Sequence, residues 1–167
     1  MAETPQQYQQ RMLGNVTGQQ PRKVQAATAG RLEKLLRGVT RARLAKRPAP
    51  GKWSVNEILA HLVEAEIVLS YRMRTIVGAP GSPIQGFDQD RWAAEGNYNK
   101  RDARKSLATF RALREANLDW LKDRSPQQRK AFGIHSERGE ESVEFIERMM
   151  AGHDVNHIRQ IEAILKK

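Results

Sequence analysis

The chain contains no cysteine among its 167 residues. This absence excludes a disulfide framework, an iron–sulfur cluster, a cysteine nucleophile and a zinc site with thiolate ligands. Any metal bound by this chain must therefore be held by nitrogen and oxygen atoms.

Long apolar runs are also lacking. None approaches the roughly 18 to 20 residues that a membrane-spanning helix needs. The N-terminal sequence MAETPQQYQQRML does not contain the apolar core of a secretory signal. We therefore expect a cytoplasmic protein with no part in a membrane, and its length favours one bundle domain with a substantial core.

Acidic residues are scarce in the first 50 positions, where ten Lys or Arg stand against only Glu3 and Glu33. Most of the net charge of +10 arises there, and residues 51–167 are close to neutral. The basic stretch 31–47 resembles a phosphate-binding surface in charge alone, because it has no interleaved aromatic residues and no nucleic-acid-binding motif. We interpret it as a solvated helix face, with a nucleic-acid surface as the weaker alternative.

Apolar residues at helical spacing predict four long helices. We expect them from Pro21 to the break at Pro48-Ala49-Pro50-Gly51, from Ser54 to Gly78, from Asp102 to Asp123, and from Glu140 almost to the C-terminus. A short helix is expected near residues 88–95, and residues 127–140 are interpreted as an irregular loop. No stretch alternates apolar and polar residues, so we predict no significant sheet.

The predicted fold is all-α, an antiparallel four-helix bundle that occupies residues 21–167. Residues 1–20 are rich in glutamine and carry few large apolar groups. We expect them to form a short docking helix around Tyr8–Leu13 or a loose arm, because Gly14 and Gly18 favour an early stop.

Two histidines, His153 and His157, interrupt the aliphatic stripe of the last helix. Their spacing of four residues is about one helical turn, so both imidazoles project from the same inward face. Burial of two unpaired imidazoles is unfavourable unless each finds a partner, and one metal ion would serve both. The alternative is a pair of core histidines that are satisfied by hydrogen bonds.

His61 lies at the edge of the second helix's apolar stripe and would complete a site with three nitrogen ligands. Such a site leaves coordination positions open, which distinguishes a working metal from a structural one. The alternative for His61 is a boundary histidine that bonds across helices. HDVNH also resembles the HExxH zinc-protease motif, but Asp154 replaces the glutamate base and only ten residues follow His157.

Four further polar residues have open roles. His135, in the expected loop, is interpreted as solvent-exposed, with an acid–base or substrate contact as the alternative. Glu57 and Glu64 share a helix face with His61; Glu57 also stands at the capping-box position after Ser54. Gln160, one turn beyond His157, is a candidate hydrogen-bond partner within the site.

Three segments together, PAPGKWSVNEILAHLVEAE, FDQDRWAAEGNY and GHDVNHIRQIE, resemble the DinB-like (DinB/YfiT-like) superfamily of metalloenzymes. The resemblance extends from about residue 20 to the end of the chain. It implies a four-helix bundle whose three-histidine metal site falls on His61, His153 and His157, and it implies a homodimer. Relatives with assigned activities include thiol S-transferases that use low-molecular-weight thiols.

The leading hypothesis is therefore an enzyme that holds a divalent metal, zinc or nickel, at these three histidines. It would act on a small-molecule substrate, as a thiol S-transferase with a thiol cosubstrate or as a hydrolase; the sequence does not choose between them. The alternative is a non-catalytic, stress-related metal-binding or interaction protein. The sequence leaves the catalytic residues unidentified.

Overall fold

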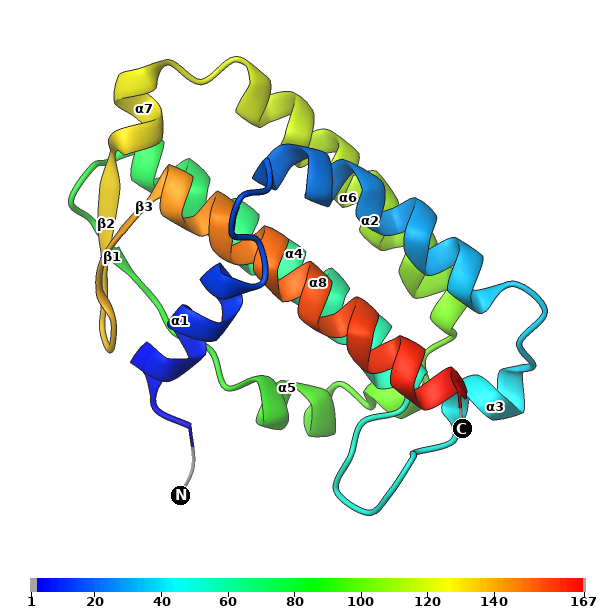
Figure 1. Cartoon of the computed structure of the whole chain (residues 1–167). Helices are drawn as coiled ribbons and strands as arrows, with labels where there is room; N and C mark the ends of the chain where they lie inside the picture. The colour runs from blue at the N-terminus through cyan, green and yellow to red at the C-terminus, as the bar shows by residue number, and fades with distance from the viewer. Residues whose placement is uncertain (1–2, 167) are drawn as a thin grey trace.

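A bundle of long helices with a small sheet at one end is seen in the computed structural model, which describes residues 3–166 (Figure 1). The long helices are α2 (Pro21–Leu36), α4 (Val55–Gly78), α6 (Ala103–Lys122) and α8 (Val143–Lys166). The shorter elements are α1 (Pro5–Gly14), α3 (Arg41–Ala45), α5 (Gln89–Glu95), the 3-10 turn η1 (Tyr98–Lys100) and α7 (Pro126–Lys130). The four-helix bundle predicted from the sequence is confirmed.

The long helices are arranged in the order α2, α8, α4 and α6 around the bundle. Cross-helix contacts give their directions. Pairs α4/α8 and α2/α6 run antiparallel, whereas α4/α6 and α2/α8 run parallel (Figure 1). The parallel pairs arise because the chain between α4 and α6 returns along the whole bundle before α6 begins. In a bundle whose successive helices alternate in direction, each connection would stay at one end.

Helix ends follow from local chemistry, with one correction to the sequence prediction. Ser54 and Glu57 form the expected capping box at the start of α4. The first long helix does not continue to Pro48: α2 ends at Leu36. Gly38 then takes a left-handed φ of 74°, which a helix does not contain, and the short α3 starts anew.

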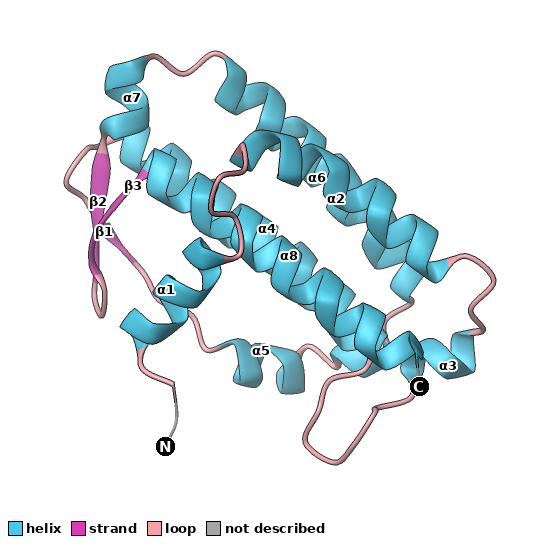
Figure 2. Cartoon of the chain, viewed as in Figure 1, coloured by secondary structure: helices cyan, strands magenta, loops and turns pink. Residues whose placement is uncertain are grey.

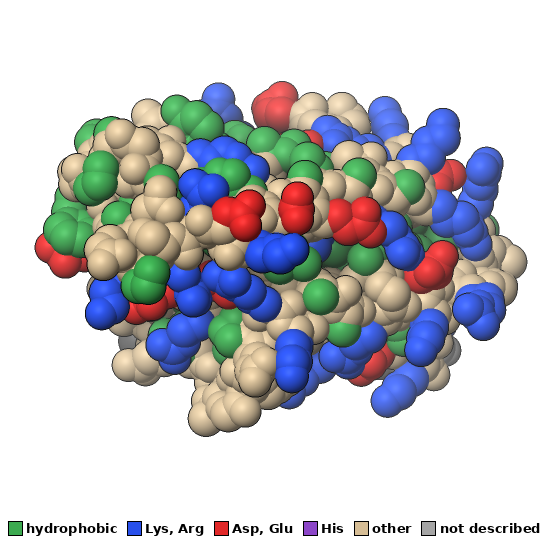
Figure 3. All heavy atoms as spheres, turned by 90° about the horizontal axis from the view of Figure 1, so that it is seen from above, with side chains coloured by type: hydrophobic (Ala, Val, Ile, Leu, Met, Phe, Trp, Pro, Cys, Tyr) green, Lys and Arg blue, Asp and Glu red, His purple; other side chains and the backbone are tan. Residues whose placement is uncertain are grey.

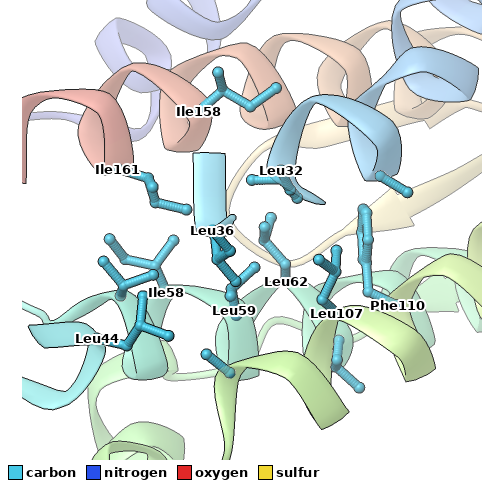
Figure 4. Packing of buried hydrophobic residues seen from close by; sticks show 14 of the residues in the cluster. Leu32, Leu36, Leu44, Ile58, Leu59, Leu62, Leu107, Phe110, Ile158 and Ile161 are labelled. Atoms are coloured by element: carbon cyan, nitrogen blue, oxygen red, sulfur yellow. The ribbon is translucent and has the colours of Figure 1, made fainter. Parts of the chain in front are cut away.

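The main apolar core lies between all four long helices. Leucine, isoleucine and phenylalanine side chains from each helix point toward one another, and Leu44 of α3 closes one end (Figure 4). The labelled members are Leu32 and Leu36 of α2, Ile58, Leu59 and Leu62 of α4, Leu107 and Phe110 of α6, and Ile158 and Ile161 of α8. This core holds α4 and α8 rigidly side by side.

The sequence predicted no significant sheet, and the structure adds one small sheet at the end of the bundle. Strands β1 (Pro83–Ile84), β2 (Phe132–His135) and β3 (Gly139–Ser142) form a three-stranded sheet, in which β1–β2 is parallel and β2–β3 antiparallel (Figure 2). The expected loop 127–140 thus contains α7 and most of a hairpin, and the last helix starts at Val143 instead of Glu140. The strands are only two to four residues long and β3 contains no apolar residue, so no sustained alternation marks them; β2 exposes Phe132 and Ile134 and buries Gly133 and His135.

Basic side chains of the stretch 31–47 lie on the surface, and some of them pair with acids of other elements. Figure 3 shows Lys and Arg side chains gathered at the right-hand end of the visible face, and acidic side chains among basic ones over its middle. This agrees with the interpretation of a solvated face. Three of its arginines pair with acids elsewhere in the chain: Arg31 with Glu162, Arg41 with Asp102 and Arg47 with Glu57.

Among the described residues, no helix is long and apolar enough for a membrane span.

Helix α1 crosses α8 at very close range. The crossing point is Gly152, where a Cβ atom would clash with the carbonyl group of Met12, whose carbon atom would lie only 2.6 Å away. Met12 is fully buried, and the Asn15 side-chain amide donates to the Gly152 carbonyl (3.1 Å). The missing side chain therefore allows α1 to dock on α8. Whether residues 1–20 form a unit separate from 21–167 stays a prediction.

The substitution Gly152→Ala tests this contact. We expect it to lower the free energy of unfolding by about 1–3 kcal/mol, because the backbone of α1 must move away. The matched control is Gly30→Ala in the interior of α2, where a Cβ meets nothing within 4 Å. That change should stabilise the protein by about 0.5–1 kcal/mol through helix propensity alone. Urea denaturation of both variants gives the comparison; equal effects would contradict the close crossing.

Candidate metal centre

Three histidines converge between α4 and α8. The Nε2 atom of His153 lies 2.9 Å from Nε2 of His61 and 3.1 Å from Nε2 of His157. One nitrogen from each ring lies within 4.8 Å of the others. His61 comes from α4, and the other two come from successive turns of the antiparallel α8, so the rigid contact of two helices brings together residues 92 positions apart.

Burial keeps these rings neutral. His61 is 1% and His157 7% exposed, whereas His153 is half-buried. Desolvation, followed by the influence of His157, lowers the pKa of His61 to about 3. Desolvation also lowers the pKa of His157 to about 4 and holds that of His153 well below its ordinary value. At neutral pH the three imidazoles are uncharged, and their lone pairs are available to a ligand.

The protons on the rings show why three nitrogens at this distance suit a cation. Nδ1 of His157 lies 2.9 Å from Gln160 Oε1, which only accepts, so this nitrogen carries the proton and Nε2 offers a lone pair. A single hydrogen on His153 Nε2 cannot serve both neighbouring nitrogens well. Two imidazole nitrogens bound to one metal ion at about 2.1 Å lie roughly 3.0–3.4 Å apart, close to the separations seen here.

The hydrogen bonds behind the three rings are unequal. Gln160 orients His157, as the sequence suggested, and such a partner normally accompanies a histidine ligand. His61 has no equivalent: its Nδ1 is buried and has no partner within residues 3–166. Trp53 packs against the His61 ring with the ring centroids 5.0 Å apart, so the orientation of His61 rests on packing.

A buried charged network lies beside the histidines. The guanidinium of Arg114 donates to Glu66 Oε2 (2.8 and 3.0 Å) and to both carboxylate oxygens of Asp154 (2.5 and 3.1 Å). The carboxylates of Asp154 and Glu66 raise the pKa of Arg114 against the opposing effect of desolvation. Asp154 follows His153 directly and is only 1% exposed. Its carboxylate is engaged by Arg114, so it is not free to act as the base of a protease motif.

The remaining sequence candidates lie outside the cluster. Glu57 caps α4 and pairs with Arg47, and Glu64 pairs with Arg101 (2.7 Å). His135 is 1% exposed on β2, so the prediction that it is a solvent-exposed loop residue is wrong. Its Nδ1 accepts from the Glu137 backbone N–H (3.2 Å), and its Nε2 is buried without a partner in the described chain.

The buried charges of Arg114 and Glu66 were not predicted from the sequence. Arg114 lies one turn after Phe110 on the core stripe of α6, and Glu66 lies one turn after Leu62 on that of α4. A charged residue in a stripe position was an available signal, because burial of a charge requires a partner. Arg72 gave a weaker signal of the same kind, because it lies between Leu69 and Ile76 at helical spacing, and the structure shows that it is 4% exposed.

Comparisons with known proteins were made for the whole chain. The family model of the DinB superfamily matches residues 26–161. A proposed metal-dependent hydrolase of Oceanobacillus iheyensis is 20% identical over 135 residues, which are 81% of this chain and 78% of that protein. The structure of YfiT from Bacillus subtilis, described as a probable metal-dependent hydrolase with an unusual four-helix bundle topology, matches with a TM-score of 0.81 at 17% identity. That match covers 99% of this chain and 89% of YfiT.

The lowered histidine pKa values predict a stability that depends on pH. In the unfolded chain histidines titrate near pH 6.5, whereas His61 and His157 in the native protein stay neutral down to about pH 3 and 4. Below pH 6.5 the unfolded state therefore binds more protons than the native state, so the free energy of unfolding decreases as the pH is lowered. For metal-free protein we expect these histidines to lower the free energy of unfolding by roughly 3 kcal/mol or more when the pH is lowered from 7 to 4.5.

Urea denaturation across this pH range measures the effect. The control is the triple variant His61→Gln, His153→Gln, His157→Gln, which retains every carboxylate. Its stability should fall less steeply than that of the wild type; parallel curves would show that the three rings are not neutral in the native protein.

Proposed function

Because this chain belongs to the DinB superfamily, we propose that it is a metal-dependent hydrolase whose divalent metal is held by His61, His153 and His157. The observation that carries the proposal is the convergence of three neutral Nε2 atoms at the contact of α4 and α8. The relatives described as metal-dependent hydrolases support the reaction class. A hydrolase of this kind acts on a small-molecule substrate.

Zinc or nickel suits the donor set best. The site has three imidazoles and no thiolate, and imidazole is a good ligand for both ions. Three protein ligands leave room for water and substrate. When bound, such an ion supplies a Lewis acid that polarises a carbonyl group and lowers the pKa of water toward neutrality.

The protein's own side chains orient and dry the site. Gln160 keeps the proton of His157 on Nδ1, so that Nε2 faces inward with its lone pair. Trp53 covers the ring of His61. Of the three histidines, His153 lines a small pocket beside the cluster, so we propose that the substrate approaches along its side.

Transfer to a thiol is the alternative reaction of the same centre. The chain has no cysteine, so a thiolate nucleophile would have to come from a low-molecular-weight thiol cosubstrate. A non-catalytic metal-binding protein is the alternative of a different class. We also propose that the protein is cytoplasmic and forms a homodimer, on the basis of its sequence and its family resemblance.

Metal content is the first test of the proposal. Wild-type protein purified without an affinity tag should contain close to one equivalent of zinc or nickel by plasma mass spectrometry, and His157→Ala should lose it. His135→Ala is the matched control, since it removes a buried histidine outside the cluster and should retain the metal. Loss of metal in both His157→Ala and His135→Ala would contradict the proposed metal site. Failure of the wild type to take up added zinc or nickel would also contradict it.

The metal-loaded protein is then assayed for ester and amide hydrolysis, with and without an added thiol. Turnover that needs only water supports the hydrolase. Turnover that requires the thiol overturns the hydrolase in favour of transfer. If His157→Ala lowers the melting temperature and the loaded wild type turns over nothing, the non-catalytic alternative holds.

Gln160→Ala tests the orienting hydrogen bond. We expect the metal affinity to fall by about 10- to 100-fold, the usual effect of removing a partner behind a histidine ligand. Stability of the metal-free protein should change little, because Gln160 is only partly buried. Competition against a chromophoric chelator measures the affinity, and an unchanged affinity would mean that the His157 orientation does not depend on this contact.

A further inference from the structure

A small pocket opens beside the three histidines, where α1, α4, α8 and β3 meet. Its volume is about 90 Å³, room for several water molecules. His153 lines it, and three apolar side chains, Leu69, Ile146 and Met149, form much of its wall. The pocket therefore places one of the three rings at the edge of a partly apolar chamber.

Arg72 gives the pocket a buried positive charge that no carboxylate neutralises. This residue lines the pocket and is 4% exposed. Its Nη2 donates to the Gln85 carbonyl, while its Nε is buried and has no partner. Among the described residues it forms no ion pair, unlike the other buried arginine, Arg114. A buried, uncompensated guanidinium is unfavourable, so the site is built for a negative partner.

The neighbouring charges leave this excess in place. Arg138 and Glu141 also line the pocket, but they pair with each other through two bonds of 2.6 and 3.2 Å. The three groups together carry a net charge of +1. Burial and then the charge of Arg138 lower the pKa of Arg72 to about 10, so it remains protonated at neutral pH. Tyr8 of α1 completes the polar part of the wall.

The size and charge of the pocket select one kind of anion. One excess positive charge matches a monoanion, whereas a phosphate monoester carries nearly two negative charges at neutral pH. The fork of N–H donors on a guanidinium fits a carboxylate in two-point contact. The apolar wall between Arg72 and His153 suits a short carbon chain.

We propose that this pocket binds the carboxylate of the substrate through Arg72, so that the scissile bond of a small acid lies beside His153. The assignment of the substrate class rests on the proposed hydrolase function, but binding of the carboxylate does not need the metal. Arg72 is a specificity-determining residue in this arrangement, and the hydrolase acts on small molecules that carry a carboxylate a few atoms from the bond that is cleaved.

Butyrate and its neutral analogue butyramide are the probes for the test, with inorganic phosphate as a third. Binding is followed by NMR titration of the wild type, of Arg72→Gln and of Arg72→Lys. We expect wild type to bind butyrate, and to bind butyramide and phosphate at least about tenfold more weakly. Arg72→Gln should lose about tenfold or more in butyrate affinity, while Arg72→Lys, which keeps the charge, should lose less.

Two further variants make the result specific. Arg74→Gln lies on the same helix, bonds to Ser70 and Asn117, and does not line the pocket, so it should bind butyrate like wild type. His157→Ala, which removes a proposed metal ligand, should also keep butyrate binding. Failure of the metal site would therefore leave the pocket result intact. Butyramide or phosphate binding as tightly as butyrate, or equal butyrate binding by Arg72→Gln, would overturn the proposal.

Discussion

The guanidinium of Arg114 joins all four long helices of this bundle. It extends from α6 to Glu66 of α4 and Asp154 of α8, and it donates to the backbone carbonyl of Gln25 in α2 (3.3 Å). Thr28 of α2 adds a contact to Asp154 (2.9 Å). Apolar packing alone tolerates a shift of one helix along another, whereas two-point contacts between charged groups do so poorly. The network thus sets the register of α4 against α8.

That register positions the three histidines. His61 and the pair His153 and His157 come from opposite helices, so a shift of one turn would separate them by about 5.4 Å. The same network has a net charge of −1 beside the cluster, which favours a cation there and compensates part of the cost of bringing one into the bundle. Stability and the candidate chemistry therefore depend on the same buried contacts.

Much of the helical architecture could be predicted from the sequence, because apolar spacing and caps are local signals. The Ser54–Glu57 capping box and the breaks near residues 48–51 and 78–83 set the bounds of α4 well. The spacing of His153 and His157 on an apolar stripe indicated that they face inward, and the structure does bring His61 to them. Metal binding itself stays a prediction that neither spacing nor proximity tests.

Other features depend on contacts that no local pattern contains. Strand β2 shows the reverse of the usual pattern, with Ile134 outside and His135 inside, because Gly133 lets the strand lie directly against Ile76 and Ile84. Arg72 follows Tyr71, which is 70% exposed, and precedes Met73, which is fully buried. Helical spacing places it at the boundary, and only the packing of Gln85 and Phe87 against its guanidinium shows that it is buried.

The parallel pairing of α2 with α8 has a kinetic consequence. Their contacts join residues 122 and 126 positions apart, as between Gln25 and Glu147 and between Thr28 and Asp154. Because α2 packs on α8 and α6, its contacts with α8 close a loop of most of the chain. The histidine cluster, which needs α8, can therefore form only after synthesis of nearly the whole chain.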